Sequence, residues 1–199
     1  MLFVPVRVPP HKRAEADPGA DHRLAMCRLA VAGDGRLAVS DLELRRPGPS
    51  YTVDTLRELH DADPDRELTF IVGADMARTL GSWREPLEIL TLARLAVAER
   101  EGAARREIRE ALAGLDGEDR VEFLDMPTID VSSSQTRERV AAGETIEGLV
   151  PDAVAAYIEA HALYRAASTA GRPSAADSQP DASDAQPGAP AGHPGGPHQ

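Results

Sequence analysis

Short apolar runs alternate with longer segments of helical periodicity along most of the chain. Runs typical of buried strands occupy residues 2–4, 68–72, 95–98 and 121–124, and a shorter alternating segment lies around Leu37 and Val39. Apolar residues spaced three or four apart predict helices over about 21–31, 53–59, 74–80, 86–93, 108–115, 132–142 and 151–163. Strands that alternate with helices in this way predict an α/β fold built on a doubly wound parallel sheet.

The pattern ends near residue 165. Beyond it the sequence is dominated by Ala, Pro, Gly, Ser and Asp, with almost nothing to bury in a core. The chain of 199 residues is long enough for one domain with a full hydrophobic core. We therefore expect a domain over residues 1–165 and a disordered tail over 166–199.

Ligands of such sheets bind beyond the carboxyl ends of the parallel strands. The loops after Val4, Val72 and Leu124 are therefore expected to face one cleft. They contain three runs that carry chemistry: Pro9-Pro10-His11-Lys12, Gly73-Ala74-Asp75 and Ser132-Ser133-Ser134.

The serine run begins a predicted helix, with Arg137 about one turn further on. Free N–H groups, hydroxyls and the positive end of the helix dipole make such a helix start attractive to an anion. The guanidinium of Arg137 could reach phosphate oxygens. The same residues also fit an ordinary helix cap with a surface arginine, which is the more frequent arrangement.

The other two loops also allow two interpretations. Prolines stiffen the approach to His11 and Lys12, so that Lys12 could serve as a point charge for phosphate, or it could be a solvated loop lysine. Gly73 permits close backbone approach, and Asp75 could accept hydrogen bonds from ribose hydroxyls or simply cap its helix.

Aromatic residues make up only 4% of the chain, and two of them lie in predicted loops. Tyr51 and Trp83, the single tryptophan, could stack against a flat ligand or could pack at the rim of the core.

Charge and composition narrow the classes of function. The formal net charge of -11 disfavours nucleic acid as a partner, because an acidic chain repels phosphate backbones at long range. No run approaches the ~20 apolar residues of a membrane helix, and the first residues do not resemble a signal peptide. The single cysteine, Cys27, cannot form an internal disulfide or a cysteine metal cluster, so we expect a small core residue and a cytoplasmic protein. Metalloprotease, serine hydrolase and P-loop motifs do not occur in the sequence.

Taken in order, several segments resemble bacterial nicotinate-nucleotide adenylyltransferases, members of the nucleotidyltransferase superfamily with a Rossmann-like fold. The resemblance spans about residues 2–164. It rests on these segments: Phe3-Val4-Pro5, Pro9-Pro10-His11-Lys12, Gly48-Pro49-Ser50-Tyr51-Thr52-Val53-Asp54-Thr55-Leu56, Phe70-Ile71-Val72-Gly73-Ala74-Asp75, Trp83, Val131-Ser132-Ser133-Ser134 with Arg137, and 149–164.

The resemblance implies adenylyl transfer from ATP to nicotinate mononucleotide, which gives deamido-NAD and pyrophosphate in NAD biosynthesis, with Mg²⁺ on the ATP phosphates. It implies catalytic charge stabilisation by two cationic side chains, Lys12 and Arg137. It implies no protein-held metal, and a homo-oligomer is compatible with it. The implied ATP-binding residues are His11, Lys12, Gly73, Asp75, Ser132, Ser133, Ser134 and Arg137. The implied nicotinate nucleotide-binding residues are Tyr51, Thr52 and Trp83.

Three departures from the family pattern stand out. Ser134 replaces a threonine, and Thr136 replaces an apolar residue. The family also opens with a first strand, a Gly-x-Phe-Asp-Pro loop and a His-x-Gly-His motif, none of which precedes Leu2. We expect the upstream reading frame to encode this βα unit, of roughly thirty residues.

Two alternatives stay open at this point. A nucleotide-binding remnant would bind ligand without releasing pyrophosphate. A related adenylyltransferase would prefer another acceptor, such as nicotinamide mononucleotide or pantetheine phosphate.

Overall fold

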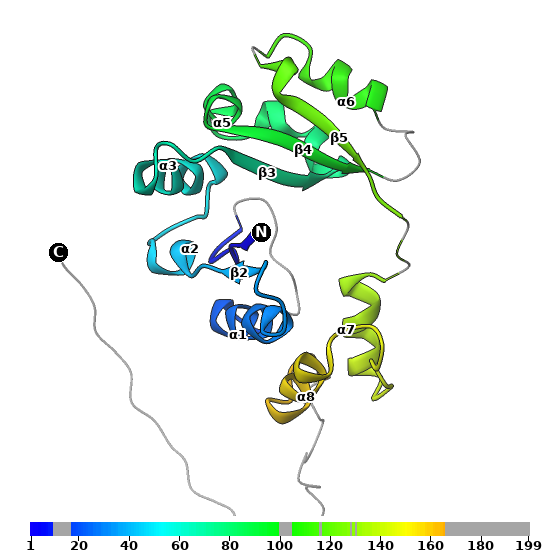
Figure 1. Cartoon of the computed structure of the whole chain (residues 1–199). Helices are drawn as coiled ribbons and strands as arrows, with labels where there is room; N and C mark the ends of the chain where they lie inside the picture. Colours follow the sequence, from blue (N-terminus) through cyan, green and yellow to red (C-terminus); the bar gives the residue numbers. More distant parts are fainter. Residues whose placement is uncertain (10–16, 100–104, 116, 128, 130, 166–199) are drawn as a thin grey trace, which may run out of the picture. The chain divides into compact units, whose positions relative to one another are not determined.

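Strands and helices alternate through the chain as the hydrophobic pattern predicts (Figure 1). The computed structural model describes residues 1–9, 17–99, 105–115, 117–127, 129 and 131–165. The strands are β1 (Leu2–Phe3), β2 (Ala38–Val39), β3 (Leu68–Gly73), β4 (Ala93–Glu99) and β5 (Val121–Asp125). The helices of the first half are α1 (Ala20–Val31), α2 (Leu42–Arg45), α3 (Thr52–Ala62), α4 (Ala74–Arg78), the 3-10 turn η1 (Leu80–Ser82) and α5 (Pro86–Leu92). Those of the second half are α6 (Arg105–Leu112), the 3-10 turn η2 (Glu118–Arg120), α7 (Ser133–Ala141) and α8 (Asp152–Ala160).

All strand pairings in the described residues are parallel, which confirms the predicted α/β class. The strands fall into two sheets, however, one of order β1-β2 and one of order β3-β4-β5. The loop after Val4 therefore leaves a different sheet from the loops after Val72 and Leu124. Within the described residues β1 pairs only with β2 and β3 only with β4, so we correct the expectation that one sheet brings all three loops to a common edge.

The three-stranded sheet has one face covered by helices. Alternate side chains of β3, β4 and β5 point to this face, where Val72, Leu95 and Val97 are buried against residues of α3, α4, α5 and α6. The helices contribute Val53, Ile89 and Ile108, each no more than 1% exposed. Burying these side chains supplies the main driving force for this part of the fold.

A second, smaller core joins helices from both ends of the described chain. Val154 and Ile158 of α8 are buried with Ile146, and Met26 and Leu29 of α1 pack against them. The phenol of Tyr157 hydrogen-bonds the ring of His22 at 2.9 Å, which fixes α8 against α1. The tail expected over 166–199 lies outside the described residues.

Candidate functional site

The segment that leads into the Pro9-Pro10-His11-Lys12 run is tied to the residue before Tyr51. Ser50 is buried, and its N–H donates to the carbonyl of Val8 at 3.0 Å. The N–H of Arg7 in turn donates to Ser50 Oγ at 3.1 Å. His11 and Lys12 lie outside the described residues, so the structure places only the approach to them.

Tyr51 and Thr52 form the start of α3. Tyr51 has extended backbone, its carbonyl accepts from the N–H of Thr55 at 3.3 Å, and Thr52 is the first helical residue. The Tyr51 ring is half-buried at the edge of the core. The start of this helix offers unpaired N–H groups and the positive end of a dipole.

Three contacts fix the position of Trp83. Its backbone N–H donates to the Leu80 carbonyl at 2.9 Å, and its indole Nε1–H donates to Thr79 Oγ1 at 3.0 Å. The indole meets the ring of Phe70 edge to face, with centroids 6.1 Å apart. A half-buried ring fixed in this way can offer a flat surface to a ligand without much loss of side-chain freedom.

Arg84, which the sequence analysis did not single out, joins Trp83 to the start of α3. Its guanidinium carbon lies 4.8 Å from the centre of the Tyr51 ring. Tyr51 and the Trp83-Arg84 turn therefore lie together, although thirty-one residues separate Tyr51 from Trp83 in the sequence. No motif marks Arg84 beforehand; its only signal is its place directly after the single tryptophan.

A network of charges surrounds Arg84. Arg84 Nη1 lies 3.6 Å from Asp54 Oδ2, and its Nε lies 3.2 Å from Glu85 Oε1. Arg57 pairs with Asp54, Glu85 and Glu88. The hydrogen bonds to Glu88 and, next, to Glu85 raise the pKa of the Arg57 guanidinium. The hydrogen bond from Arg57 likewise lowers the pKa of Glu88.

Gly73 and Asp75 lie where the sequence places them, at the carboxyl end of β3. Gly73 aligns with Ala98 in the sheet, and the next residue of β4, Glu99, aligns with Asp125 at the end of β5. The three strands thus end at the same edge. The carboxylate of Asp75 is 97% exposed and pairs with Arg78 Nη1 at 2.7 Å. A Cβ added to Gly73 would meet nothing within 4 Å, so a ligand has room to approach its backbone.

The serine loop forms the predicted helix start. Ser132 caps α7: its Oγ accepts from the N–H of Gln135 at 3.1 Å, while its own N–H donates to Gln135 Oε1 at 3.2 Å. Arg137 Nη2 donates to Ser134 Oγ at 3.2 Å, and Ser133 is exposed. The ordinary cap is therefore present, and Ser133, Ser134 and Arg137 remain accessible beside it.

Thr136, noted as a departure from an apolar family position, is buried with its hydroxyl satisfied. Its Oγ1 donates to the Ser132 carbonyl at 3.0 Å, one helical turn back. The substitution therefore leaves the buried Thr136 hydroxyl with a hydrogen-bond partner.

The structure thus brings some predicted residues together and leaves others apart. Tyr51 and Trp83 both pack against the same hydrophobic core, and Thr52 follows Tyr51 at the start of α3. Gly73 and Asp75 share a sheet edge with the strand that leads to the serine loop. Within the described residues, no hydrogen bond or ion pair joins Ser132 or Arg137 to Asp75 or Trp83.

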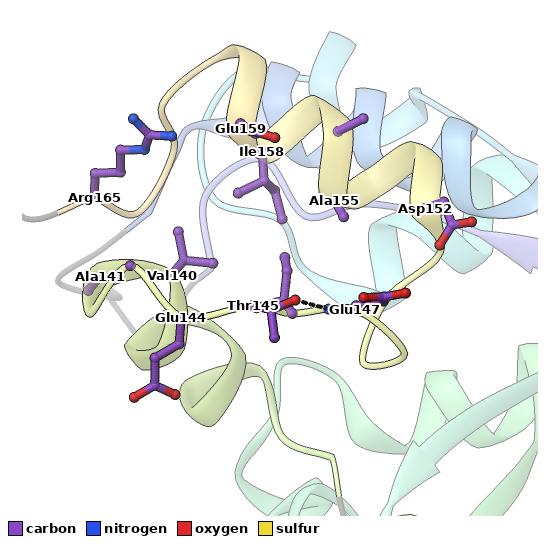
Figure 2. A pocket seen from close by; sticks show the side chains of 13 residues that line it. Val140, Ala141, Glu144, Thr145, Glu147, Asp152, Ala155, Ile158, Glu159 and Arg165 are labelled. Carbon is purple, nitrogen blue, oxygen red and sulfur yellow. Dashed lines mark hydrogen bonds between the residues drawn. The ribbon is translucent and has the colours of Figure 1, made fainter.

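Two hollows lie beside α7. One of about 440 Å³ is lined by Ser132 together with Gln135, Glu138 and Arg139. The other, of about 810 Å³, lies between the end of α7 and α8 (Figure 2) and contains none of the predicted site residues. Its lining includes the carboxylates of Glu144, Glu147, Asp152 and Glu159, which would repel a triphosphate.

In the part of the chain that the structure describes, no helix has the length and apolar character needed to cross a membrane.

The chain is similar in sequence to a known family of proteins. The model of the cytidylyltransferase-like family matches residues 1–139. A probable nicotinate-nucleotide adenylyltransferase of Symbiobacterium thermophilum is 42% identical over 175 residues, which cover 86% of this chain and 83% of that protein. Another, from Roseiflexus sp. (strain RS-1), is 44% identical over 167 residues, covering 83% of this chain and 82% of that protein.

A solved structure shares the fold. The Plasmodium falciparum nicotinic acid mononucleotide adenylyltransferase complexed with NaAD superposes with a TM-score of 0.64, covering 82% of this chain and 81% of that one at 19% identity. The arrangement of parallel strands and helices described above is therefore that of a known nucleotidyltransferase fold.

Proposed function

This chain belongs to the nicotinate-nucleotide adenylyltransferases, within the cytidylyltransferase-like family, and we propose that it transfers the adenylyl group of ATP to nicotinate mononucleotide. The products would be deamido-NAD and pyrophosphate, in the biosynthesis of NAD.

One observation carries the proposal beyond family membership. Arg84 lies over the Tyr51 ring, directly after Trp83 in the chain, so the start of α3 and the tryptophan turn form one surface. An indole fixed by Thr79 and Phe70 suits the flat pyridine ring of the acceptor. Thr52, at the positive end of α3, suits its carboxylate.

We propose the roles of the remaining residues from the family resemblance and, where the structure describes them, from their places in the fold. Gly73 and Asp75, at the carboxyl edge of the sheet, would line the nucleotide ribose. Ser132, Ser133 and Ser134 would hold the triphosphate at the start of α7, with Arg137 one turn along. His11 and Lys12, beyond the anchored Arg7–Val8 segment, would add positive charge.

The reaction is a direct displacement at phosphorus. A phosphate oxygen of nicotinate mononucleotide forms a bond to the α-phosphorus of ATP, the bond from that phosphorus to the bridging oxygen breaks, and pyrophosphate leaves with the electron pair. The protein contributes orientation of the two phosphates and stabilisation of developing negative charge. We assign the charge stabilisation to Lys12 and Arg137.

Enzymes of this family use a divalent metal with ATP, and we propose Mg²⁺ here. The described residues hold no group of three or more His, Cys, Asp or Glu side chains placed to bind an ion. The ion would accompany the triphosphate and neutralise part of its charge. The substrates and the unpaired Cys27 suit a cytoplasmic protein.

The test is pyrophosphate release by the full chain with ATP, in the presence and absence of nicotinate mononucleotide. We expect release that depends on the nucleotide. Trp83→Leu should raise KM for nicotinate mononucleotide more than KM for ATP, and Arg137→Ala should do the reverse. Binding of both substrates without nucleotide-dependent pyrophosphate would instead identify a non-catalytic binding protein.

A further inference from the structure

We infer that Arg84 is the residue that selects a carboxylate over a carboxamide on the pyridine ring of the acceptor. This inference rests on the proposed function, because it concerns the acceptor surface formed by Tyr51, Thr52 and Trp83. None of the comparisons assigns a role to Arg84.

The first support is position. The Arg84 guanidinium lies 4.8 Å from the Tyr51 ring centre and follows directly after Trp83, whose indole is fixed by Thr79 and Phe70. A pyridine ring stacked on Trp83 would carry its substituent close to this guanidinium. Arg84 is about half exposed, so a ligand can reach it.

The second support is the chemistry of the two substituents. A carboxylate carries a negative charge and only accepts hydrogen bonds, whereas a carboxamide is neutral and uses its nitrogen as a donor. A guanidinium carries a positive charge and only donates, through a planar fork that matches two carboxylate oxygens. Arg84 therefore favours the acid by both charge and hydrogen-bond pattern.

The third support is that another arginine, Arg57, also pairs with the carboxylates beside Arg84. Arg57 pairs with Asp54, Glu85 and Glu88, and two of these are also the partners of Arg84. The contact of Arg84 with Asp54 is long, at 3.6 Å, and that with Glu85 runs through Nε at 3.2 Å. The Nη groups can therefore turn to a ligand while Arg57 keeps the acidic side chains in place.

The backbone next to Arg84 is also unusual. Glu85 adopts a left-handed conformation, with φ of 52° and ψ of 57°, directly before Pro86. A non-glycine residue in this region is strained and persists only where its surroundings hold it. This turn sets the direction in which the chain passes from Arg84 into α5.

The experiment uses Trp83 as its own probe, because it is the single tryptophan of the chain. Quenching of its fluorescence is titrated with nicotinate mononucleotide and with nicotinamide mononucleotide, for the unmodified chain and for Arg84→Gln and Arg84→Lys. The matched control is Arg66→Gln, which removes an exposed arginine paired only with Asp63 in the described residues. Circular dichroism verifies that each variant is folded.

We expect the unmodified chain and Arg66→Gln to bind the acid more tightly than the amide. Arg84→Gln should lose about tenfold in affinity for the acid with little change for the amide. Arg84→Lys, which keeps the charge but not the fork, should fall between the two. An unchanged acid-to-amide ratio in folded Arg84→Gln, or an absence of acid preference in the unmodified chain, overturns the inference.

Pyrophosphate release measured on the same samples separates this inference from the proposed function. Nucleotide-dependent release with an unchanged acid-to-amide ratio in Arg84→Gln refutes the role of Arg84 alone. Acid-selective binding that depends on Arg84, without release, supports the selector and refutes the proposed catalysis.

Discussion

At the scale of single residues, Ser132 has a structural role as a helix cap and a proposed role in binding the triphosphate. Its Oγ accepts from the Gln135 N–H and so completes a reciprocal cap at the start of α7. The same helix start is the proposed triphosphate site. A substitution that removes the cap therefore changes stability as well as ligand binding, and the two effects need different variants.

Ser132→Ala should lower the free energy of unfolding by about 1 kcal/mol, because the N–H of Gln135 loses its partner. Ser132→Asp keeps an acceptor at the cap and should leave stability nearly unchanged. It places a negative charge beside the triphosphate, so it should raise KM for ATP. Urea unfolding and ATP saturation curves measure the two quantities. A stable Ser132→Asp with normal KM for ATP would mean that this loop is only a helix cap.

Single residues also show which parts of the site the sequence alone predicts and which it does not. Tyr51, Trp83 and Ser132 stand out through rarity or helix-start chemistry. The structure places Tyr51 at the start of α3, Trp83 directly after η1 and Ser132 at the cap of α7. Arg84 is one of many arginines in the sequence. What distinguishes it is its contact with the Tyr51 ring, thirty-three positions earlier in the chain. Only the folded chain brings that pair together.

At the scale of elements, a charge cluster ties the carboxyl ends of two strands to a helix. Glu99 ends β4, Asp125 ends β5, and both pair with Arg105 at the start of α6. The Glu99 side chain is fully buried, and among the described residues its Oε2 has no hydrogen-bond partner. The hydrogen bond to Glu99 is the main cause that raises the pKa of Arg105.

Arg105→Ala should lower Tm clearly more than Asp125→Ala. The first change leaves the buried carboxylate of Glu99 without its cation, whereas Asp125 is 84% exposed and remains solvated without a partner. Thermal unfolding of the two variants under the same conditions makes the comparison. Equal shifts would show that Glu99 does not depend on Arg105.

Periodicity located most elements, because strands and helices with one buried face leave a regular apolar pattern. It missed α2, whose four residues are too few to show a period. It also carried the last helix to Leu163, whereas α8 ends at Ala160 and Ala162 turns left-handed. Leu163 is still buried after that turn, so the pattern identifies it as a core residue although the helix does not reach it.

At the scale of the whole molecule, strand pairing is the property that local pattern did not reveal. Every strand has the apolar character of a parallel sheet, yet in the described residues the strands divide into two sheets. Leu2, Phe3 and Ile71, on β1 and β3, are each about 40% exposed. Pairing partners depend on long-range packing, which a single segment does not encode.

Two partly buried acidic side chains, Cys27 and Tyr164, couple the stability of this fold to pH. Burial raises the pKa of the Cys27 thiol, a shift that the charge of Arg23 partly offsets, and burial also raises the pKa of the Tyr164 phenol. A folded-state pKa above the unfolded value means that the unfolded chain loses its protons first as pH rises. Stability is therefore unaffected by these groups below the ordinary thiol pKa and decreases above it.

We expect the free energy of unfolding in urea to fall between neutral pH and about pH 10, the range of ordinary thiol and phenol ionisation. Cys27→Ala should flatten the lower part of this decline, and Tyr164→Phe the upper part. Thiol labelling should accordingly be slow in the folded chain at neutral pH. If the free energy of unfolding of Cys27→Ala declines with pH at the same slope as that of the unmodified chain, the thiol does not contribute.

The most direct test of the account is an internal competition between acceptors. The full chain is supplied with ATP and equal amounts of nicotinate and nicotinamide mononucleotides, and mass spectrometry gives the ratio of the two dinucleotides formed. We predict that deamido-NAD exceeds NAD by about tenfold or more, as expected when a guanidinium faces a carboxylate rather than a neutral amide. Equal amounts of the two products, an excess of NAD, or no dinucleotide at all would contradict it.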